Sequence, residues 1–439
     1  MFSFAILIGK IAAFLLGLVG RGSDLPGRLA LKLCPKLLGR FKRKAKIIAV
    51  TGSNGKTTTA GMIAQALTLC GKTVKTNPIG SNMTGGVATV MLKASDLRGN
   101  IGCDFLVLET DERWSRLIFA DFNPDYMLVT NLFRDQITRN NNVDFIFDIL
   151  NTVVTSETTL ILNAMDPISV RLGGDCRKIY FGCAEGALTH PEPLSITHDC
   201  KVCPVCKRRL SYDFYLHNHI GKYRCENCGF STPNPNYLLT DADLEKGAAK
   251  INGLDVRLEA PTAYGFMNLA AAAAVCAEAG LPFEDVIAAL NRIKTNKTRL
   301  DRFTIGSREG HARQGVMILS KNQNPVSFDL SISEVLRIPG EKTVVAYINN
   351  INHTNHRDTT WLWDIAFERL AGNVSNVICA GPRAYDLAVR LKYAGFDMCA
   401  VLIEPDNSGI KAAVAKTKGT LCILTELYDA KTIMEATGR

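Results

Sequence analysis

The chain has 439 residues, which is too long for one compact core and predicts two or three domains. Apolar residues make up 47% of the sequence and charged residues 21%, so the composition excludes an intrinsically disordered protein. The net charge of +9 is modest for this size and does not by itself indicate a nucleic-acid partner. Ten of the 14 cysteines lack the spacing of a disulfide framework, which indicates reduced thiols in a cytosol.

Residues 2–19 are almost wholly apolar, with Lys10 in the middle of the run. The run lacks the charged start and the small-residue cleavage site of a signal peptide. Because a central lysine is costly in a bilayer, we expect a helix that packs on the protein or lies in a membrane interface, with a true anchor as the alternative. Between Arg28 and Lys46 there are eight basic residues and no acid. Two interpretations stay open for them: a surface that attracts lipid headgroups or a pyrophosphate substrate, or an ordinary solvated face.

A phosphate-binding loop is predicted directly after the strand-like run Ile47–Val50. The backbone N–H groups of such a loop, and the start of the helix predicted at Ala60–Leu69, bind phosphate oxygens. Lys56 would neutralise the β- and γ-phosphates and the Thr57 hydroxyl would reach Mg²⁺, so ATP is the predicted nucleotide. The loop is shorter than the general P-loop pattern, and a chance glycine-rich turn is the alternative. The predicted loop residues are Thr51, Gly52, Ser53, Asn54, Gly55, Lys56, Thr57 and Thr58.

From residue 46 to residue 165, strand-like runs alternate with helical patterns, which is typical of a parallel α/β sheet that binds its ligand at the carboxyl ends of the strands. The run Phe105–Glu109 ends in three acids, Glu109, Asp111 and Glu112. A carboxylate there is well placed to bind Mg²⁺, and we choose Glu109 because it is nearest the strand end. A plain surface position is the alternative for each acid. The other strands predicted in this region are Tyr126–Thr130 and Leu160–Asn163.

A cysteine-rich insert at residues 198–233 interrupts this alternation and predicts a structural zinc ribbon. Two C-x-x-C pairs separated by eighteen residues have the spacing that closes a tetrahedral thiolate site on Zn²⁺, with a thiol redox role as the lesser alternative. The four predicted ligands are Cys203, Cys206, Cys225 and Cys228. We treat the nearby Cys200, His217 and His219 as non-ligands because the set is already complete. The insert is not a dense basic and aromatic patch, so no nucleic-acid partner is expected.

The last third of the chain predicts a second, smaller α/β domain. We expect an alanine-rich helix at Ala263–Ala279, and domain limits of 1–45 for the helical N-terminal segment, 46–302 for the ATP-binding domain with its ribbon, and 303–439 for the C-terminal domain. Lys321 and Asn322 follow a predicted strand end, where a lysine either holds a phosphate or is solvated. Asp358 is either catalytic or the N-cap of the segment that follows. The predicted strands of this domain are Gly315–Ser320, Thr343–Ile348, Asn376–Ala380 and Thr420–Leu424.

Several motifs resemble the Mur ligases and folylpolyglutamate synthases. They are T-G-S-N-G-K-T-T-T at residues 51–59, L-N-A-M-D-P at 162–167 and G-F-M-N at 265–268. Others are similar to one branch, the MurT family, whose members are the synthetase subunits of lipid II isoglutaminyl synthases. These are R-G-S-D-L-P-G at 21–27, T-N-L-F-R-D-Q at 130–136, the inserted ribbon, S-K-N at 320–322, R-D-T-T-W-L-W-D at 357–364, G-P-R-A-Y-D at 381–386 and R-L-K-Y-A-G at 390–395.

The resemblance implies a Mur ligase-type P-loop domain with an inserted ribbon, followed by a Rossmann-like domain that contacts the partner. It also implies an ATP-dependent carbon–nitrogen ligase that works with GatD, a glutaminase-like subunit that releases ammonia from glutamine. The enzyme would activate the α-carboxylate of D-glutamate in the lipid II stem peptide as an acyl phosphate and amidate it, at the inner face of the cell membrane. Asn268, Lys321 and Asn322 match family nucleotide positions. Asp358 matches the aspartate that orients the glutaminase histidine.

The sequence departs from the family pattern near the nucleotide and acceptor regions, at residues 138–142, at Thr298-Arg299 and at residues 351–356. Arg299, which stands where the family has its Gly-Arg pair, is nevertheless included among the predicted nucleotide-binding residues. Two alternative functions stay open. One is a ligase that adds an amino acid in place of ammonia, and the other is a non-catalytic scaffold with a vestigial P-loop.

Overall fold

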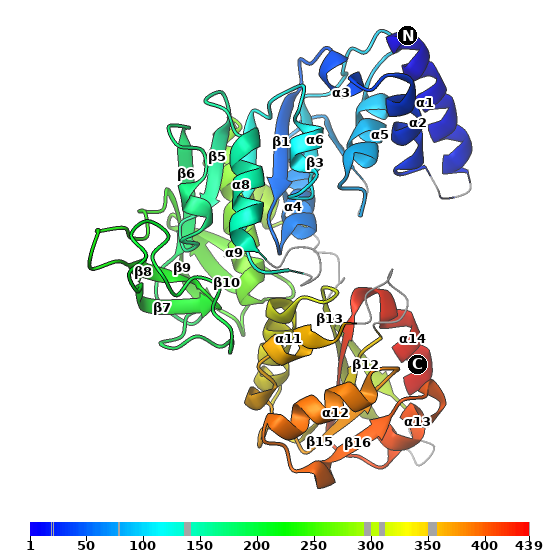
Figure 1. Ribbon diagram of the computed structural model, residues 1–439, viewed down its shortest axis with the longest axis vertical. Helices are drawn as coiled ribbons and strands as arrows, with labels where there is room; N and C mark the ends of the chain where they lie inside the picture. Colours follow the sequence, from blue (N-terminus) through cyan, green and yellow to red (C-terminus); the bar gives the residue numbers. More distant parts are fainter. Residues whose placement is uncertain are drawn as a thin grey trace.

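The computed structural model describes residues 1–18, 20, 22–77, 80–135, 142–293, 300–306, 312–349 and 358–438. Within these ranges the chain forms two α/β units, with an N-terminal group of helices beside the first unit (Figure 1). Of the sequence predictions, Arg299 and the departures at 138–141, 298 and 351–356 lie outside the described residues.

The first unit is built on a nine-stranded sheet with the order β11-β10-β9-β6-β5-β4-β1-β3-β2. Its strands are parallel from β2 to β9, whereas β10 and β11 are antiparallel. The four strands predicted in this region are confirmed to within one residue as β1, β3, β4 and β5. The strands are β1 (Lys46–Thr51), β2 (Val74–Thr76), β3 (Phe105–Glu109), β4 (Tyr126–Val129), β5 (Thr159–Asn163), β6 (Lys178–Cys183), β9 (Tyr237–Asp243), β10 (Ala248–Ile251) and β11 (Leu254–Arg257).

Helices cover both faces of this sheet because its central strands are apolar on both sides. In β1, Ile48 and Val50 pack with α4, α9 and α10, whereas Ile47 and Ala49 pack with the helices of the opposite face. The helices are α1 (Phe2–Gly17), α2 (Leu25–Leu33), α3 (Leu37–Arg40), α4 (Lys56–Leu69), α5 (Thr84–Ala94), α6 (Ser115–Ile118), α8 (Val143–Val153), α9 (Ala263–Glu278) and α10 (Phe283–Leu290).

The N-terminal apolar run forms α1, as predicted, and packs on the protein through its small residues. An added Cβ at Gly9 would lie 2.6 Å from a methyl group of Leu92 in α5 and 3.2 Å from the Cβ of Ala30 in α2. The Lys10 ammonium donates a hydrogen bond to the Ser95 carbonyl at 2.5 Å. Among the described residues, none of the helices combines the length and the apolarity needed to cross a membrane.

A smaller six-stranded sheet, with the order β12-β13-β17-β14-β15-β16, forms the second unit. All of its strands are parallel except β12, and the four predicted strands are confirmed to within two residues. Helices α11 and α12 cover one face, and α13 and α14 cover the other. The elements are β12 (Leu300–Ile305), β13 (Arg313–Ser320), α11 (Pro325–Arg337), β14 (Lys342–Tyr347), β15 (Asn376–Ala380), α12 (Ala384–Tyr393), β16 (Val401–Glu404), α13 (Asn407–Ala415), β17 (Thr420–Glu426) and α14 (Ala430–Thr437).

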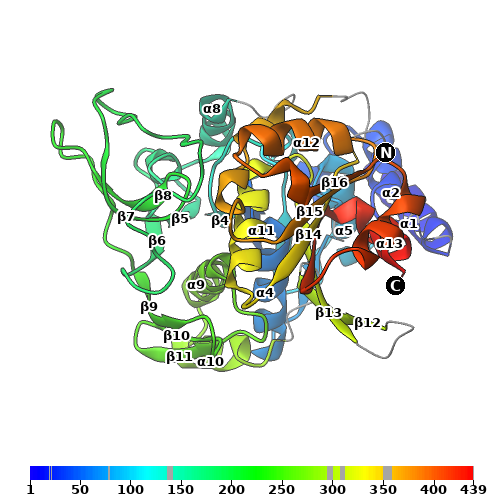
Figure 2. The same cartoon turned by 90° about the horizontal axis from the view of Figure 1, so that it is seen from below.

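The cysteine-rich insert forms a separate hairpin of β7 (Ser211–His217) and β8 (Ile220–Arg224) at one edge of the molecule (Figure 2). Its turn at Asn218 and His219 is fully buried against the first unit, so the insert is anchored at its tip.

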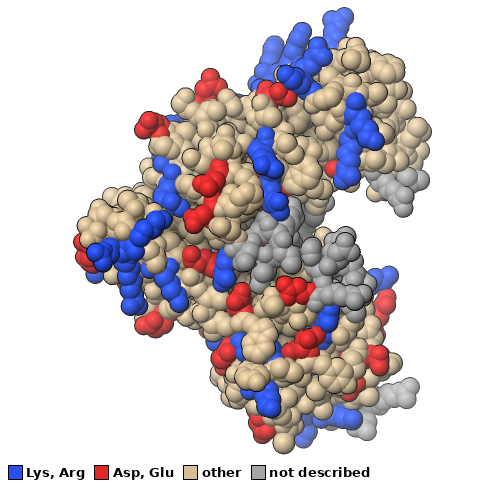
Figure 3. Space-filling model, in the orientation of Figure 1, with Lys and Arg blue, Asp and Glu red and all other residues tan. Residues whose placement is uncertain are grey.

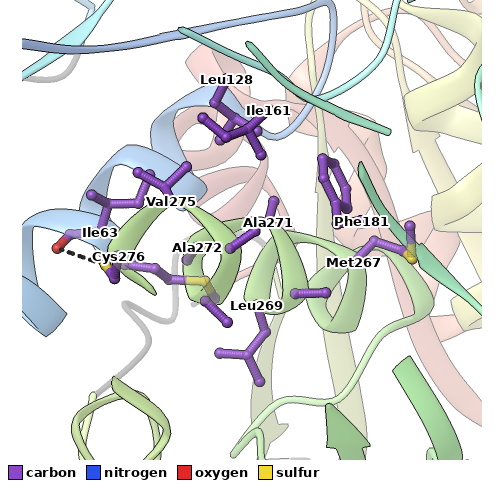
Figure 4. Packing of buried hydrophobic residues seen from close by; sticks show 14 of the residues in the cluster. Ile63, Leu128, Ile161, Phe181, Met267, Leu269, Ala271, Ala272, Val275 and Cys276 are labelled. Carbon is purple, nitrogen blue, oxygen red and sulfur yellow. Dashed lines mark hydrogen bonds between the residues drawn. The ribbon is translucent and has the colours of Figure 1, made fainter. Parts of the chain in front are cut away.

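The alanine-rich helix α9 packs beside α4 on the same face of the sheet, and its methyl groups permit a close approach (Figure 4). Ala272 is fully buried there. We expect Ala272→Leu to lower the free energy of unfolding by about 1–3 kcal/mol, because the added atoms cannot be accommodated in a packed core. Chemical denaturation would measure the loss. The matched change Ala277→Leu, at a half-buried position of the same helix, should be close to neutral, and equal losses in both variants would contradict the packing argument.

Candidate active site

The predicted phosphate loop connects β1 to α4 at the carboxyl end of the sheet. Helix α4 begins at Lys56, four residues earlier than predicted, because Gly55 has a left-handed conformation (φ 87°) that ends the loop there. Added Cβ atoms at Gly52 and Gly55 would collide with Thr130 and with Asn268, respectively. The loop is therefore enclosed by two other segments, and both glycines are required for the close approach.

Lys56, at the end of the loop, is buried and paired. The residue is only 8% exposed, and its ammonium donates hydrogen bonds to the Gly52 carbonyl and to Glu112 Oε1, the latter at 2.6 Å. Burial by itself lowers the pKa of Lys56, but the negative charge of Glu112, with smaller contributions from Glu109 and Asp135, raises that pKa above its usual value. Lys56 is therefore a fixed cation at the loop.

Glu109 lies at the end of β3, opposite Val50 of β1, and its side chain is buried. Its Oε1 accepts a hydrogen bond from Asn82 Nδ2 at 3.2 Å, and its backbone pairs with the side chain of Asn77. Thr57 lies in the first turn of α4, at the same edge of the sheet. A hydroxyl and a buried carboxylate are oxygen donors that suit Mg²⁺, so this donor set fits the predicted ion.

The segment after β4 clamps the phosphate loop. The Thr130 hydroxyl donates to the Asn54 carbonyl at 2.6 Å, and Asn131 Oδ1 accepts the Asn54 N–H at 2.9 Å. The Ser53 hydroxyl accepts the Phe133 N–H at 2.8 Å. Thr130, Asn131 and Phe133 were not predicted to belong to the site, although the T-N-L-F-R-D motif directly after a parallel strand was the signal that could have found them.

A lysine from the second unit reaches the phosphate loop. The Lys321 ammonium donates to the Ser53 carbonyl at 2.8 Å and forms an ion pair with Asp135. Asn324 Nδ2, one turn further along the chain, donates to Asp135 Oδ1 at 2.9 Å. Both units therefore contribute to one site. Asn322 lies beside Lys321, and its Oδ1 is buried without a hydrogen-bond partner among the described residues.

A pocket opens beside the phosphate loop, between the two units. Both polar atoms of the Asn54 side chain are buried at this pocket and have no hydrogen-bond partner within the described part of the chain. Asn268, from α9, lines the pocket, together with apolar side chains that suit a purine ring. Other residues that line the pocket include Phe181, His217, Ile220, Tyr264, Met267, Ile318, Leu319 and Leu330.

The ribbon hairpin is connected to the phosphate loop through Asp166. His219 Nε2 lies 3.3 Å from Asp166 Oδ1, and Asp166 Oδ2 accepts the Leu132 N–H at 2.9 Å, directly after Asn131. His217 lines the pocket and stacks on Phe133 with ring centroids 5.4 Å apart. Burial lowers the pKa of His217 to about 3, so its imidazole is neutral at physiological pH.

The four predicted zinc ligands lie together in the structure. The Sγ atoms of Cys203, Cys206, Cys225 and Cys228 are all within 4.8 Å of one another, and the pairs 203–228 and 206–225 are 3.6 and 3.4 Å apart. Four sulfurs around a tetrahedral Zn²⁺ would be about 3.8 Å apart, so the cluster fits that ion. Cys200, His217 and His219 do not belong to the cluster, as expected.

Asp358 lies in the second unit, before the 3-10 helix Thr360–Asp364, and its Oδ1 accepts the Thr360 N–H at 2.8 Å. The N-cap of this helix is Thr359, so Asp358 holds the turn before the helix and is not the N-cap that the sequence offered as one alternative. Beside it is a surface that we call the aromatic face, formed by the exposed side chains Trp363, Tyr385, Val389 and Tyr393. The rings of Trp363 and Tyr393 have centroids 5.6 Å apart. The exposed apolar area is typical of a protein-binding surface.

Comparison with known proteins first identifies the class of protein to which the chain is similar. Residues 50–231 match the Mur ligase middle domain. The fold is similar to a pseudomurein peptide ligase type C from Methanothermus fervidus (TM-score 0.69, 21% identity, covering 91% of this chain and 80% of that one). It is also similar to MurF from Thermotoga maritima, solved in complex with ADP (TM-score 0.58, 17% identity, 94% and 83% covered). The chain therefore has the fold of the Mur ligases.

The comparisons then narrow the class to one family. Residues 319–430 match the MurT ligase C-terminal domain. The chain is 30% identical to the lipid II isoglutaminyl synthase subunit MurT of Staphylococcus aureus strain COL, over 94% of this chain and 92% of that protein. It is 29% identical to the corresponding subunit of Streptococcus pneumoniae, over 89% and 86%. The chain belongs to the MurT family, as the sequence motifs indicated.

The four-cysteine cluster gives a direct test of its metal. We expect the purified protein to hold about one zinc per chain and Cys206→Ser to lose most of it and to unfold at a lower temperature, because three thiolates bind the ion less tightly than four. Elemental mass spectrometry and thermal unfolding would measure the two effects. Cys200→Ser is the matched control and should keep its zinc. Full zinc retention by Cys206→Ser would contradict this ligand set.

Proposed function

We propose that the chain is the synthetase subunit of a lipid II isoglutaminyl synthase. In this function it uses ATP and Mg²⁺ to amidate the α-carboxylate of D-glutamate in the lipid II stem peptide, with ammonia supplied by a GatD-like glutaminase. Family membership over nearly the whole chain supports this choice of acceptor and of ammonia source. Because lipid II is membrane-linked, we place the enzyme at the inner face of the cell membrane. No nucleic acid takes part.

The observation that carries the proposal is the convergence of Lys56, Glu109 and Lys321 on one phosphate loop. A carboxylate does not react with ammonia unaided, so it must first receive a good leaving group. Two fixed cations and a buried carboxylate at a phosphate loop are the groups that transfer of a γ-phosphoryl requires. Thr57 and Glu109 would hold Mg²⁺, which offsets the charge of the phosphates when it is bound.

The proposed reaction has two steps. In the first, a carboxylate oxygen of the acceptor attacks the γ-phosphorus, the bond to the β-phosphate oxygen breaks, and ADP leaves an acyl phosphate behind. In the second, the nitrogen of ammonia attacks the acyl carbon, loses a proton, and inorganic phosphate leaves. Lys56 neutralises the charge that accumulates on the phosphate oxygens, and Asn268 and the pocket beside the loop hold the base.

The glutaminase is proposed to bind at the aromatic face, next to Asp358. The exposed apolar side chains of this face supply a docking surface, and Asp358 would accept a hydrogen bond from a histidine of the partner. Such a contact would fix the tautomer of that histidine and so activate the partner's own cysteine.

A reconstitution experiment tests the reaction. The chain is mixed with its glutaminase partner, ATP, Mg²⁺, glutamine and lipid II, and the lipid product is analysed by mass spectrometry. We expect amidation, and we expect Lys56→Met to slow it by about a hundredfold or more, because the fixed cation at the transferred phosphoryl is lost. Glu109→Gln should have a similar effect and should weaken the dependence on Mg²⁺ concentration.

Lys411→Gln is the control, because Lys411 is an exposed lysine of α13, on the face of the second sheet opposite α11, which lines the pocket. If ADP appears only with an added amino acid and the lipid takes up that amino acid, the protein is an amino-acid-adding ligase. If Lys56→Met amidates as fast as the unchanged protein, the catalytic assignment is wrong.

Asp358→Asn distinguishes the release of ammonia from glutamine from the amidation of the acceptor. We expect it to slow glutamine-dependent amidation by about a hundredfold while amidation with free ammonium salts is kept, because the change affects only the partner's histidine. Rates with the two nitrogen sources give the comparison. An equal loss with both sources, or no loss with either, would refute the proposed role of Asp358.

A further inference from the structure

Helix α1 has a second apolar face that nothing in the described structure covers. Its buried side chains, Ala5, Ile6 and Ala13, point toward α2 and α5. Six large apolar residues lie on the opposite side at helical spacing and form a stripe about 100° wide. They are the exposed residues Phe4, Leu7, Ile11, Phe14, Leu15 and Leu18.

The exposure of this stripe is high for such residues. Phe14 is 70% exposed and Leu18 is 73% exposed. A helix that is apolar on all sides is ordinarily buried, and an uncovered contiguous apolar face marks a binding surface. The neighbouring helix α2 extends the surface with Leu25, Leu29 and Leu33, which are also exposed and lie one turn apart.

The stripe itself carries no charge, but it is bordered by basic side chains. Lys10, the charged residue within α1, is turned away from the stripe toward the Ser95 carbonyl. The basic segment, residues 28–44, begins within α2 and contains no acid. In Figure 3 lysine and arginine side chains gather near α3, and few charged side chains are drawn over α1. The exposed basic residues of the basic segment are Arg28, Lys32, Lys36, Arg40, Lys42, Arg43 and Lys44.

We propose that the exposed faces of α1 and α2, with the basic segment, form a surface that docks on an anionic lipid bilayer. Apolar side chains would enter the boundary between headgroups and acyl chains, and the lysines and arginines would contact the phosphates. Because the other side of α1 is packed against α2 and α5, the helix lies on the bilayer and does not cross it. A twofold dimer through this face would bring the two basic segments toward each other, which charge repulsion opposes.

This surface deepens the proposed function, since a bilayer is where a lipid-linked acceptor is found, but it can be tested without that acceptor. The full-length chain is sedimented with vesicles that lack lipid II. One set contains phosphatidylcholine alone and the other equal parts of phosphatidylcholine and phosphatidylglycerol. We expect the protein to bind the anionic vesicles, and to bind the neutral vesicles about tenfold more weakly. Binding to the anionic vesicles should fall with added salt.

Two variants test the two parts of the surface. Phe14→Gln/Leu18→Gln should reduce binding to both kinds of vesicle by about tenfold, because both side chains are exposed and would enter the bilayer. Lys36→Gln/Lys44→Gln should reduce only the binding to anionic vesicles. The matched control is Ile196→Gln/Met398→Gln, which changes two exposed apolar residues elsewhere and should bind normally. Thermal unfolding verifies that each variant is folded.

The proposal is overturned if the unchanged protein does not sediment with anionic vesicles, or if Phe14→Gln/Leu18→Gln binds as well as the control. It is also overturned if light scattering finds a dimer that this variant abolishes while vesicle binding is absent, because a second copy then covers the face. Amidation of detergent-solubilised lipid II is measured in parallel. Normal amidation by a variant that has lost vesicle binding separates docking from catalysis, and failure of amidation in the unchanged protein affects only the proposed function.

Discussion

One buried ammonium group determines how the nucleotide site is built. Lys56 is almost completely removed from water, and an unpaired cation in that position would be strongly destabilising. Glu112 and the Gly52 carbonyl supply its partners. Glu112 can reach Lys56 only because β3 lies beside β1. The ion pair therefore depends on the strand order of the sheet. On the proposed function, a triphosphate that enters the loop would compete with Glu112 for the same ammonium, so Glu112 would occupy the place of the phosphate charge.

Contacts from distant parts of the chain hold the loop in its shape. Asn131 and Ser53 connect it to the segment after β4, and Lys321 connects it to the second unit. Asp166 connects that same segment to His219 at the buried tip of the ribbon hairpin. The four-cysteine cluster lies at the other end of this hairpin, so order in the ribbon supports the wall of the pocket beside the phosphate loop. This arrangement gives the ribbon a structural reason to be inserted where it is, although its four sulfurs leave no open position for catalysis.

The parts that the sequence predicted well are those in which the signal is local. The strands at β1, β3 and β15, the loop up to Lys56 and the spacing of the cysteines each depend on residues close together in the chain. The antiparallel strands β10 and β11 were missed because they are short and only partly buried. The sequence could not predict that Glu112 pairs with Lys56, because the turn after β3 decides which acid points at the ammonium. Glu109 was therefore chosen over Glu112 without knowledge of this ion pair. The contact of Lys321 with Ser53 joins residues 268 positions apart, and no local pattern encodes it.

Helix α5 joins the proposed docking surface to the proposed metal-binding carboxylate. On one side it packs against α2, where the Gly27 N–H donates to the Thr89 hydroxyl at 2.9 Å. At its amino-terminal end, Asn82 holds the side chain of Glu109. An acceptor whose lipid tail stays in the bilayer at α1 and α2 would therefore approach the phosphate loop from the side of α5 and Glu109. The second unit, which carries Asp358 and the aromatic face, contacts that loop through Lys321 and so reaches it from another direction. On the proposed function, the lipid-linked carboxylate thus reaches the γ-phosphoryl group, and ammonia the acyl carbon, by separate routes, so neither has to leave before the other arrives.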